Sequence, residues 1–372
     1  MLSGRCEHGR AGIGTLAQME HVPLLVVGPA EVEVSGRRDG DRLLVAEADL
    51  AAATGWELKA QGLCRADACV PVSDRSGLGP DGWIDLIAMA GAIGHPVAAE
   101  PPLGVVSIGE PASTRSAALA SLDAPDITLP TVGGGCTSVA EHTGKKRLVV
   151  SFASWCGCRH DLPVWQELHE RWQDNGFEVI GVAVDEDAAV VQPWVDEARA
   201  TFPVMVDADH RFVDAYGIRN VPTVVWIDED DRIVQPNVAA FGDDQFVDFH
   251  GVPAGPHLDA LERWVVGGEA PFADDAAVRD AQALPTDDDQ LARTEFRLAL
   301  ALHRRGEVEA AGRHFDEAGR LAPWDFTIRR SAMPLRGQDP FGQPFFDLYE
   351  EWEKVGRPYY TDPSPAPDRS SG

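Results

Sequence analysis

The fold class and the expected chemistry both follow from one segment, Val149-Val150-Ser151-Phe152-Ala153-Ser154-Trp155-Cys156-Gly157-Cys158-Arg159-His160-Asp161-Leu162-Pro163. An apolar, β-prone run ends in small residues, and two cysteines one residue apart precede a stretch with helical spacing. A thiol at this point lies where a strand passes into a helix N-terminus. The unpaired N–H groups and the dipole of that end stabilise a thiolate. The segment therefore predicts a reactive cysteine.

The residues around this segment alternate between predicted strands and predicted helices. We expect strands at 147–153, 177–184, 202–206 and 221–228, and helices at 162–172, 188–200 and 257–266. Such alternation is typical of βαβ units, in which helices cover the faces of a sheet. The fold class predicted for the middle of the chain is α/β.

Four short matches to a known family occur in order along this part of the chain. They are Ala124-Pro125-Asp126 with Leu129-Pro130, the approach Phe152 to Cys156, Arg159 with Pro163, and Val221-Pro222-Thr223. Together they resemble the thioredoxin-like redoxins of the TlpA/ResA (AhpC/TSA-related) type. The resemblance implies a thioredoxin-like domain over 123–270, with Trp155, Cys156, Cys158, Arg159 and Pro222 in its active site. It also implies a cis Val221–Pro222 bond beside the active-site sulfur.

The spacing of the two cysteines departs from the family pattern. The family has Cys-x-x-Cys, whereas Cys156-Gly157-Cys158 is one residue shorter and lacks the Pro. A disulfide across one intervening residue closes a tighter ring, and strained disulfides are more readily reduced. We expect Cys156 to be an exposed nucleophile with a low pKa and Cys158 to be the resolving thiol. The pair should have a higher reduction potential than ordinary thioredoxin.

The resemblance implies thiol–disulfide exchange on a protein or small-molecule disulfide. No organic cofactor and no metal is implied, and the electrons would come from an external thiol reductant. Arg159 could stabilise the thiolate, or it could be a cation on the helix surface. His160 and Asp161 could transfer protons, although solvated first-turn side chains are the more usual interpretation.

Two other functions stay open. In a peroxiredoxin-like thiol peroxidase with antioxidant activity, Cys156 would attack peroxide, and Cys158, Cys136 or another protein's thiol would resolve the sulfenic acid. Against this, Ala153 occupies the place where peroxiredoxins normally have Thr. A redoxin fold used only for binding or as a scaffold is the third hypothesis.

The sequence of the first 122 residues predicts a small α+β module. Cys64 and Cys69 flank a predicted turn within it, and three interpretations apply: a regulatory or resolving disulfide, half of a metal site, or two buried hairpin thiols. The sequence favours buried thiols, because free Cys commonly behaves as a small hydrophobe. Cys6 lies in a Gly-rich arm, where we expect no role for it.

Residues 271–372 predict a helical domain. Helices at 292–305 and 308–321, closed by Pro323, resemble one tetratricopeptide-type pair, and 341–355 predicts a further helix with an apolar face. One pair cannot bury its own apolar face, so it should pack on the redoxin domain, on the final helix, or on a protein partner. We expect 270–289 to be a linker and 363–372 a disordered tail.

The overall composition excludes several classes of partner. A net charge of -28 argues against nucleic acid and anionic membranes, because both need basic patches. No run of about 18 apolar residues predicts a membrane span, and the N-terminus has no clear secretory signal. A cytoplasmic setting follows by default. Six cysteines are too few for a disulfide scaffold in a chain of 372 residues.

Overall fold

The computed structural model describes residues 20–357, and these divide into two compact units. The first takes the chain up to Val26 with Glu31–Ile93 and Ala99–Val106, and the second takes the rest. The arm that carries Cys6 and the predicted tail at 363–372 lie outside the described residues. The division into three domains at 122 and 270 stays a prediction.

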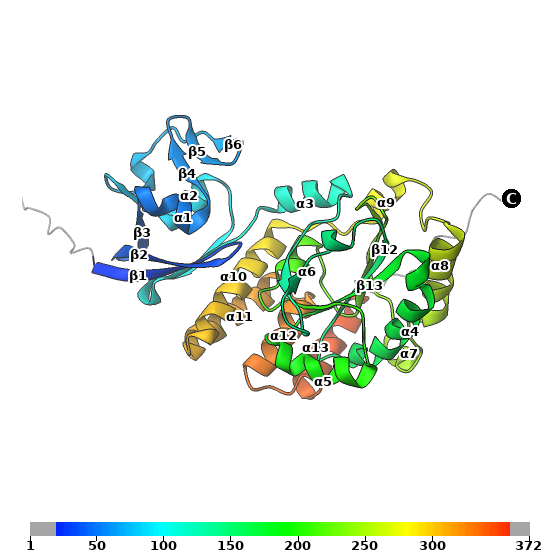
Figure 1. Cartoon of the computed structure of the whole chain (residues 1–372). Helices are drawn as coiled ribbons and strands as arrows, with labels where there is room; N and C mark the ends of the chain where they lie inside the picture. The colour runs from blue at the N-terminus through cyan, green and yellow to red at the C-terminus, as the bar shows by residue number, and fades with distance from the viewer. Residues whose placement is uncertain (1–19, 358–372) are drawn as a thin grey trace, which may run out of the picture. The chain divides into compact units, whose positions relative to one another are not determined.

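The N-terminal part of the chain forms a sheet module with two short helices, as the predicted α+β class requires (Figure 1). Its six-stranded sheet has the order β7 (Trp83–Asp85), β3 (Arg42–Ala46), β2 (Glu31–Asp39), β1 (Glu20–Val27), β9 (Val105–Ile108) and β8 (Val97–Glu100). A second sheet orders β4 (Glu57–Lys59), β5 (Gly62–Arg65) and β6 (Ala68–Val70). The helices are α1 (Leu50–Thr54) and α2 (Leu86–Ala92).

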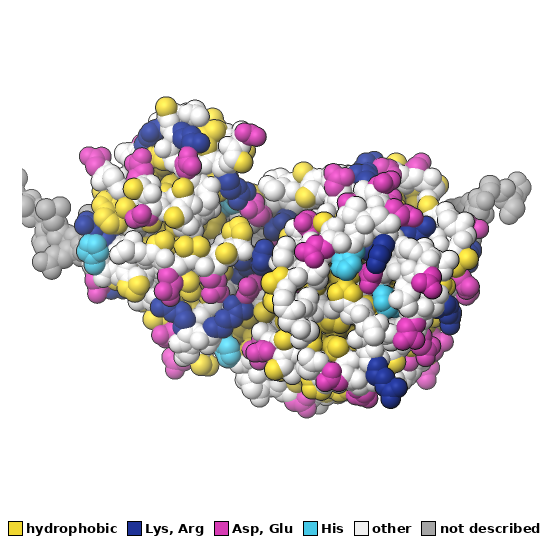
Figure 2. All heavy atoms as spheres, in the orientation of Figure 1, with side chains coloured by type: hydrophobic (Ala, Val, Ile, Leu, Met, Phe, Trp, Pro, Cys, Tyr) yellow, Lys and Arg dark blue, Asp and Glu magenta, His cyan; other side chains and the backbone are white. Residues whose placement is uncertain are grey.

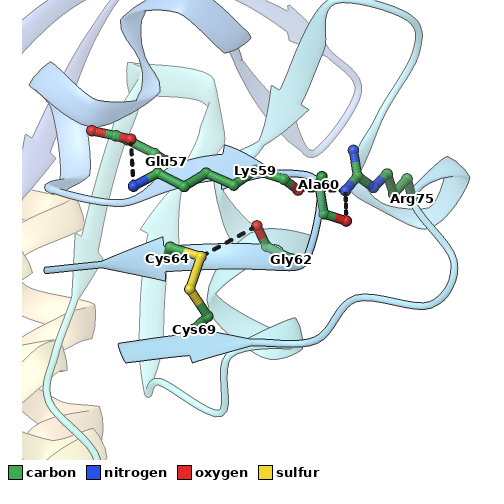
Figure 3. Close-up of a disulfide and its surroundings, with 7 residues drawn as sticks. All are labelled: Glu57, Lys59, Ala60, Gly62, Cys64, Cys69 and Arg75. Atoms are coloured by element: carbon green, nitrogen blue, oxygen red, sulfur yellow. Dashed lines mark hydrogen bonds and ion pairs between the residues drawn. A yellow bond between two sulfur atoms is a disulfide. The ribbon is translucent and has the colours of Figure 1, made fainter. Parts of the chain in front are cut away.

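Cys64 and Cys69 form a disulfide in this module (Figure 3). The antiparallel register of β5 and β6 places the two residues directly opposite each other. The prediction of two buried thiols is wrong, because Cys69 is exposed and the two sulfurs are bonded. The metal-site alternative also falls, since neither sulfur is free to act as a ligand. The spacing alone could not distinguish these cases, because it does not fix the strand register.

A five-stranded mixed sheet lies at the centre of the second unit. Its order is β14 (Val204–Val206), β13 (Phe177–Ala183), β12 (Lys146–Phe152), β15 (Thr223–Ile227) and β16 (Ile233–Val238). The first three strands run parallel, and β15 runs antiparallel to both of its neighbours. Every residue of β13 is buried, which suits a strand covered on both faces. The predicted strands are confirmed.

Three longer helices cover this sheet: α4 (Leu162–Trp172), α5 (Ala188–Ala198) and α8 (Ala254–Gly267). The rings of Trp165 on α4 and His257 on α8 lie 6.4 Å apart, so these two helices share one face (Figure 1). The shorter elements are α3 (Ala112–Ser121), β10 (Leu129–Pro130), β11 (Cys136–Thr137), α6 (Arg211–Ala215), α7 (Val247–His250) and α9 (Asp275–Ala281). This is the thioredoxin-like α/β arrangement that the resemblance implies.

Four helices follow, and one of them was not predicted. They are α10 (Asp287–Arg304), α11 (Val308–Leu321), α12 (Phe326–Leu335) and α13 (Gln343–Lys354). The pair α10 and α11 matches the predicted helices, and a capping box of Thr286 and Asp289 begins α10. The predicted linker contains α9. No helix was predicted at α12, which is short and has Pro334 inside it.

The helical region packs on the thioredoxin-like domain. Arg293 of α10 donates to the Ile218 carbonyl and forms a buried ion pair with Asp325. The backbone N–H of Phe326 donates to the Arg219 carbonyl at 2.7 Å. The helix pair therefore covers the chain's own core, as one of the three expectations stated. Its likeness to a tetratricopeptide unit stays a prediction.

Acidic side chains are spread over the visible face of the molecule and do not gather into one patch (Figure 2). This distribution fits a net charge of -28 that acts on solubility. Among the helices in residues 20–357, none has both the length and the apolar character that a membrane span needs.

Candidate active site

Cys156 lies at the junction between β12 and the active-site helix. The strand ends at Phe152, and a 3₁₀ turn, Gly157–Asp161, leads directly into α4. Cys156 caps this turn, and its Sγ accepts a hydrogen bond from the Cys158 N–H at 3.4 Å. The structure thus places the thiol at the strand-to-helix boundary that the sequence predicts.

The Val221–Pro222 bond is cis and lies beside this sulfur. The Cys156 Sγ is 3.5 Å from the Val221 carbonyl oxygen. Cys156, Cys158, Arg159 and Pro222 all line one cavity of about 410 Å³. Four of the five predicted site residues therefore meet at one place.

Trp155 is the fifth predicted site residue. It is buried and does not line the cavity, but it helps to hold the backbone that leads into the cysteine motif. Its indole N–H donates to the Val184 carbonyl at 3.0 Å. Ser154 next to it donates from both its N–H and its hydroxyl to the carboxylate of Asp185. These bonds hold the backbone before Cys156 in one conformation.

The two cysteines have pKa values shifted in opposite directions. A hydrogen bond from Cys158, together with the positive charge of Arg330, lowers the pKa of Cys156 to about 6. Burial and the neighbouring Cys156 sulfur raise the pKa of Cys158 well above its usual range. Near pH 7 the pair therefore consists of a thiolate at Cys156 and a protonated thiol at Cys158. The expectation that Cys156 is exposed is wrong, because only 6% of it is accessible.

Arg330 is a site residue that the sequence analysis missed. It comes from α12, and its guanidinium donates to the Trp155 carbonyl at 2.8 Å and to the Pro340 carbonyl at 3.1 Å. The same group lies 4.1 Å from the ring centroid of Phe345. No local pattern marks this arginine, which is 175 residues from Trp155 in the sequence.

Arg159 has a different set of contacts from the one predicted. Its guanidinium donates to the Ser154 carbonyl at 2.6 Å. It also lies 4.1 Å from the ring centroid of Trp194 and 4.8 Å from that of Phe341. Arg159 therefore forms part of the cavity wall, while the positive charge that lowers the Cys156 pKa comes from Arg330.

Asp161 is buried, so the interpretation of it as a solvated first-turn side chain is wrong. Burial raises the pKa of its carboxyl to about 7, and the charges of Asp243 and Cys156 add to this. The charge of Asp161 in turn raises the pKa of Cys158. A carboxyl that titrates near neutral pH beside a protonated thiol is a candidate proton acceptor. His160 lines the cavity, with its ring 5.6 Å from that of Trp194.

Aromatic side chains form most of the cavity wall. They come from α7 and its flank, from α12, from α13 and from the loop between α12 and α13, and include Phe246, Phe249, Phe326, Phe341, Phe345 and Tyr349. The sequence predicted an apolar face on the last helix but not that this face covers the active site. Cys136 is exposed on β11 and lies outside this cavity, so a redox role for it stays a prediction.

Comparison with known proteins places this site in a family. Residues 120–250 match the Redoxin family model. A protein named thiol-disulfide oxidoreductase ResA from Halalkalibacterium halodurans is 29% identical over 136 residues, which cover 36% of this chain and 77% of that protein. A ResA of Bacillus thuringiensis is 26% identical over 114 residues, covering 30% of this chain and 66% of its own length.

A solved structure of a thiol:disulfide interchange protein of the thioredoxin family from Chlorobium tepidum is also similar. It is 29% identical, covers 30% of this chain and 81% of its own, and has a TM-score of 0.28. All three matches cover well under half of this chain. The family match, together with the sheet and the cysteine pair described above, identifies residues 120–250 as a redoxin-family domain with a thioredoxin-like fold.

Proposed function

We propose that this protein is a thiol–disulfide oxidoreductase in which Cys156 is the nucleophile and Cys158 the resolving thiol. The observation that carries the proposal is the opposed shift of the two pKa values, which prepares one sulfur to attack and keeps the other protonated. The names of the relatives, thiol-disulfide oxidoreductase ResA, support the same reaction class.

The reaction begins with the Cys156 thiolate. It attacks one sulfur of the substrate disulfide, the substrate S–S bond breaks, and one substrate thiolate leaves and takes a proton from water. Cys158 then loses its proton, for which Asp161 is the acceptor, and attacks the Cys156 sulfur. The mixed disulfide bond between Cys156 and the substrate breaks, the second substrate thiolate leaves and takes a proton from water, and a Cys156–Cys158 disulfide remains. Two electrons have passed from the pair to the substrate.

An external thiol reductant must return these two electrons before the next turnover. The steps above use only the chain's own side chains and need no organic cofactor and no metal. A protein partner held through the C-terminal helices is a further proposal. The cytoplasmic setting also stays a prediction, and the Cys64–Cys69 disulfide is more typical of oxidising compartments.

Thiol release from the reduced protein tests the proposal. With Cys6 and Cys136 replaced by Ser, the protein should release two thiols per chain from a small disulfide, while the further change Cys156→Ser should release none. Cys158→Ser should stop after one thiol and retain a mixed disulfide on Cys156 that mass spectrometry detects. Full turnover by Cys156→Ser would exclude this mechanism. No release by the unsubstituted protein from any disulfide would instead favour a binding role.

The peroxidase alternative rests on the same low-pKa thiolate beside an arginine. Mass spectrometry after treatment with peroxide distinguishes the two reactions. A sulfenic acid on Cys156 with Cys158 still free would favour the peroxidase. A Cys156–Cys158 disulfide formed in exchange with a disulfide substrate supports the oxidoreductase.

A further inference from the structure

We propose that the cavity beside Cys156 binds a low-molecular-weight disulfide with an aromatic body. The inference rests on the proposed function, because Cys156 supplies the attacking sulfur. It goes beyond that function by naming the substrate class. Four observations carry it: the size of the cavity, the residues that line it, the contact between one of these residues and the cysteine motif, and its charge.

The size of the cavity fits a small molecule. About 410 Å³ lies within the range of roughly 300–1,000 Å³ that small-ligand sites occupy. The C-terminal helices α12 and α13 supply much of its wall, so a small molecule bound there would contact both these helices and the cysteine motif.

Exposed phenylalanines concentrate at this cavity. Within residues 20–357, four phenylalanines are more than a third accessible: Phe246 (37%), Phe249 (41%), Phe341 (41%) and Phe346 (50%). All four line the cavity. Several exposed aromatic rings around a reactive sulfur support a binding site here, because grouped exposed apolar side chains often belong to ligand-binding grooves or interaction sites.

One of these rings lies against the cysteine motif itself. A Cβ atom added to Gly157 would be 3.4 Å from the Phe246 ring. Gly157 separates the two cysteines, so the ring lies over the space that a side chain between them would occupy. An aromatic group that stacks on Phe246 therefore brings its attached sulfur close to Cys156. Aromatic pairs in offset or edge-to-face contact gain stabilisation beyond the burial of their surface.

The charge of the cavity differs from that of the whole protein. No Asp or Glu among the described residues lines it, although the chain carries a net charge of -28. Its two permanent charges are the cations of Arg159 and Arg330. The site therefore accepts a neutral or anionic aromatic disulfide, and its cations favour the thiolate that leaves.

The test is single-turnover reduction of two dianionic disulfides by the full-length reduced protein. One is aromatic, 5,5′-dithiobis(2-nitrobenzoic acid), and the other is aliphatic, 3,3′-dithiodipropionic acid. We expect the rate to saturate with the aromatic compound and to rise linearly with the aliphatic one. Phe246→Ala and Phe341→Ala should each raise the half-saturation concentration about tenfold and change the plateau rate less than twofold.

The controls keep the chemistry constant. Phe246→Tyr retains the ring and should keep the half-saturation concentration. Val308→Ala removes an apolar side chain that is 61% exposed and outside the cavity, and it should behave like the unsubstituted protein. Reduction of insulin reports on a protein disulfide as the occupant.

Two outcomes would overturn the inference while the proposed function stands. One is thiol release without saturation and without effect of either Phe substitution. The other is an equal loss of insulin reduction in the Phe variants, which would assign the cavity to a protein segment. If neither disulfide nor insulin is reduced at all, the proposed function itself has failed.

Discussion

Arg330 and Asp161 act on the two cysteines with opposite effects. The Arg330 cation lowers the pKa of Cys156, whereas the Asp161 carboxylate raises the pKa of Cys158. Each group therefore favours the protonation state that its cysteine needs before reaction. Both roles can be measured separately, because one changes the nucleophile and the other changes the resolving thiol.

Replacing Arg330 with Met should raise the pKa of Cys156 from about 6 toward the usual thiol value, because the thiolate loses its nearby cation. The measurement is the pH profile of iodoacetamide alkylation at Cys156, resolved from the other cysteines by mass spectrometry, with Cys158 retained because its hydrogen bond also lowers the Cys156 pKa. At pH 6 alkylation should slow severalfold, and Arg330→Lys should recover part of the rate. A profile with an unchanged midpoint would contradict the role of Arg330, even if the variant were less stable.

Replacing Asp161 with Asn should change how stability depends on pH. Burial raises the folded-state pKa of Asp161 to about 7, above its value of 3.8 when exposed. Its stabilising contribution is complete below pH 4 and is lost as pH rises through 7, where a buried charge must form. Asp161→Asn should therefore have the same free energy of unfolding as the parent near pH 4. At pH 8 its free energy of unfolding should be higher by about 1–3 kcal/mol. Equal stability of the two proteins at pH 8 would contradict this prediction.

At the scale of elements, α12 depends on one buried carboxylate. Asp325 caps the helix by accepting from the Ile328 N–H at 3.1 Å, and it pairs with Arg293 at 2.6 Å. The helix in turn carries Arg330 to the Trp155 carbonyl. The position of the active-site cation therefore follows from an ion pair at the start of another helix.

Asp325→Ala should lower the free energy of unfolding by about 3–5 kcal/mol, because it leaves Arg293 buried without its partner. It should also raise the pKa of Cys156, since α12 loses its cap. Asp274→Ala is the matched control: it removes the N-cap of α9, which accepts from the Ala277 N–H at 2.9 Å at an exposed position. Asp274→Ala should lower the free energy of unfolding by only ~1 kcal/mol and leave the Cys156 pKa unaltered. If Cys156 had the same pKa in both variants, the position of α12 would not control the pKa of Cys156.

Local sequence pattern predicted most elements of the redoxin domain but not α12. The buried strand before Trp155 and the helix after Cys158 each have a periodicity that neighbouring residues determine. The contact between Arg330 and the Trp155 carbonyl joins residues 175 positions apart, and no spacing rule reports it. The Cys64–Cys69 disulfide was not predicted for a related reason: whether the two cysteines lie opposite each other depends on the strand register. The motif thus predicted where the chemistry lies, while the residues that regulate it come from distant packing.

At the scale of the whole molecule, the chain has two cysteine pairs in different environments. Cys64 and Cys69 are bonded across a hairpin, whereas Cys156 and Cys158 are separate thiols at a helix start. We expect Cys156–Cys158 to be reduced at a higher potential, because its ring is tight and its thiolate is stabilised.

Redox titration in glutathione buffers, followed by alkylation and mass spectrometry, measures both pairs in one sample. The Cys156–Cys158 disulfide should be reduced in more oxidising buffers than the Cys64–Cys69 disulfide. Cys64→Ser with Cys69→Ser should leave the potential of the first pair unchanged. Reduction of both pairs at one potential, or in the reverse order, would contradict this expectation and the tight-ring argument behind it.

The shielding of Cys156 has a kinetic consequence. With 6% of its surface accessible, this sulfur meets only molecules that enter between the aromatic rings of the cavity. The thiolate of Cys156 needs no deprotonation near pH 7, so bond exchange can begin once the partner sulfur is aligned. The product thiol must then leave by the route through which its parent entered. Turnover should therefore be limited by release of product, and solvent viscosity should slow the steady-state rate more than it slows the first turnover.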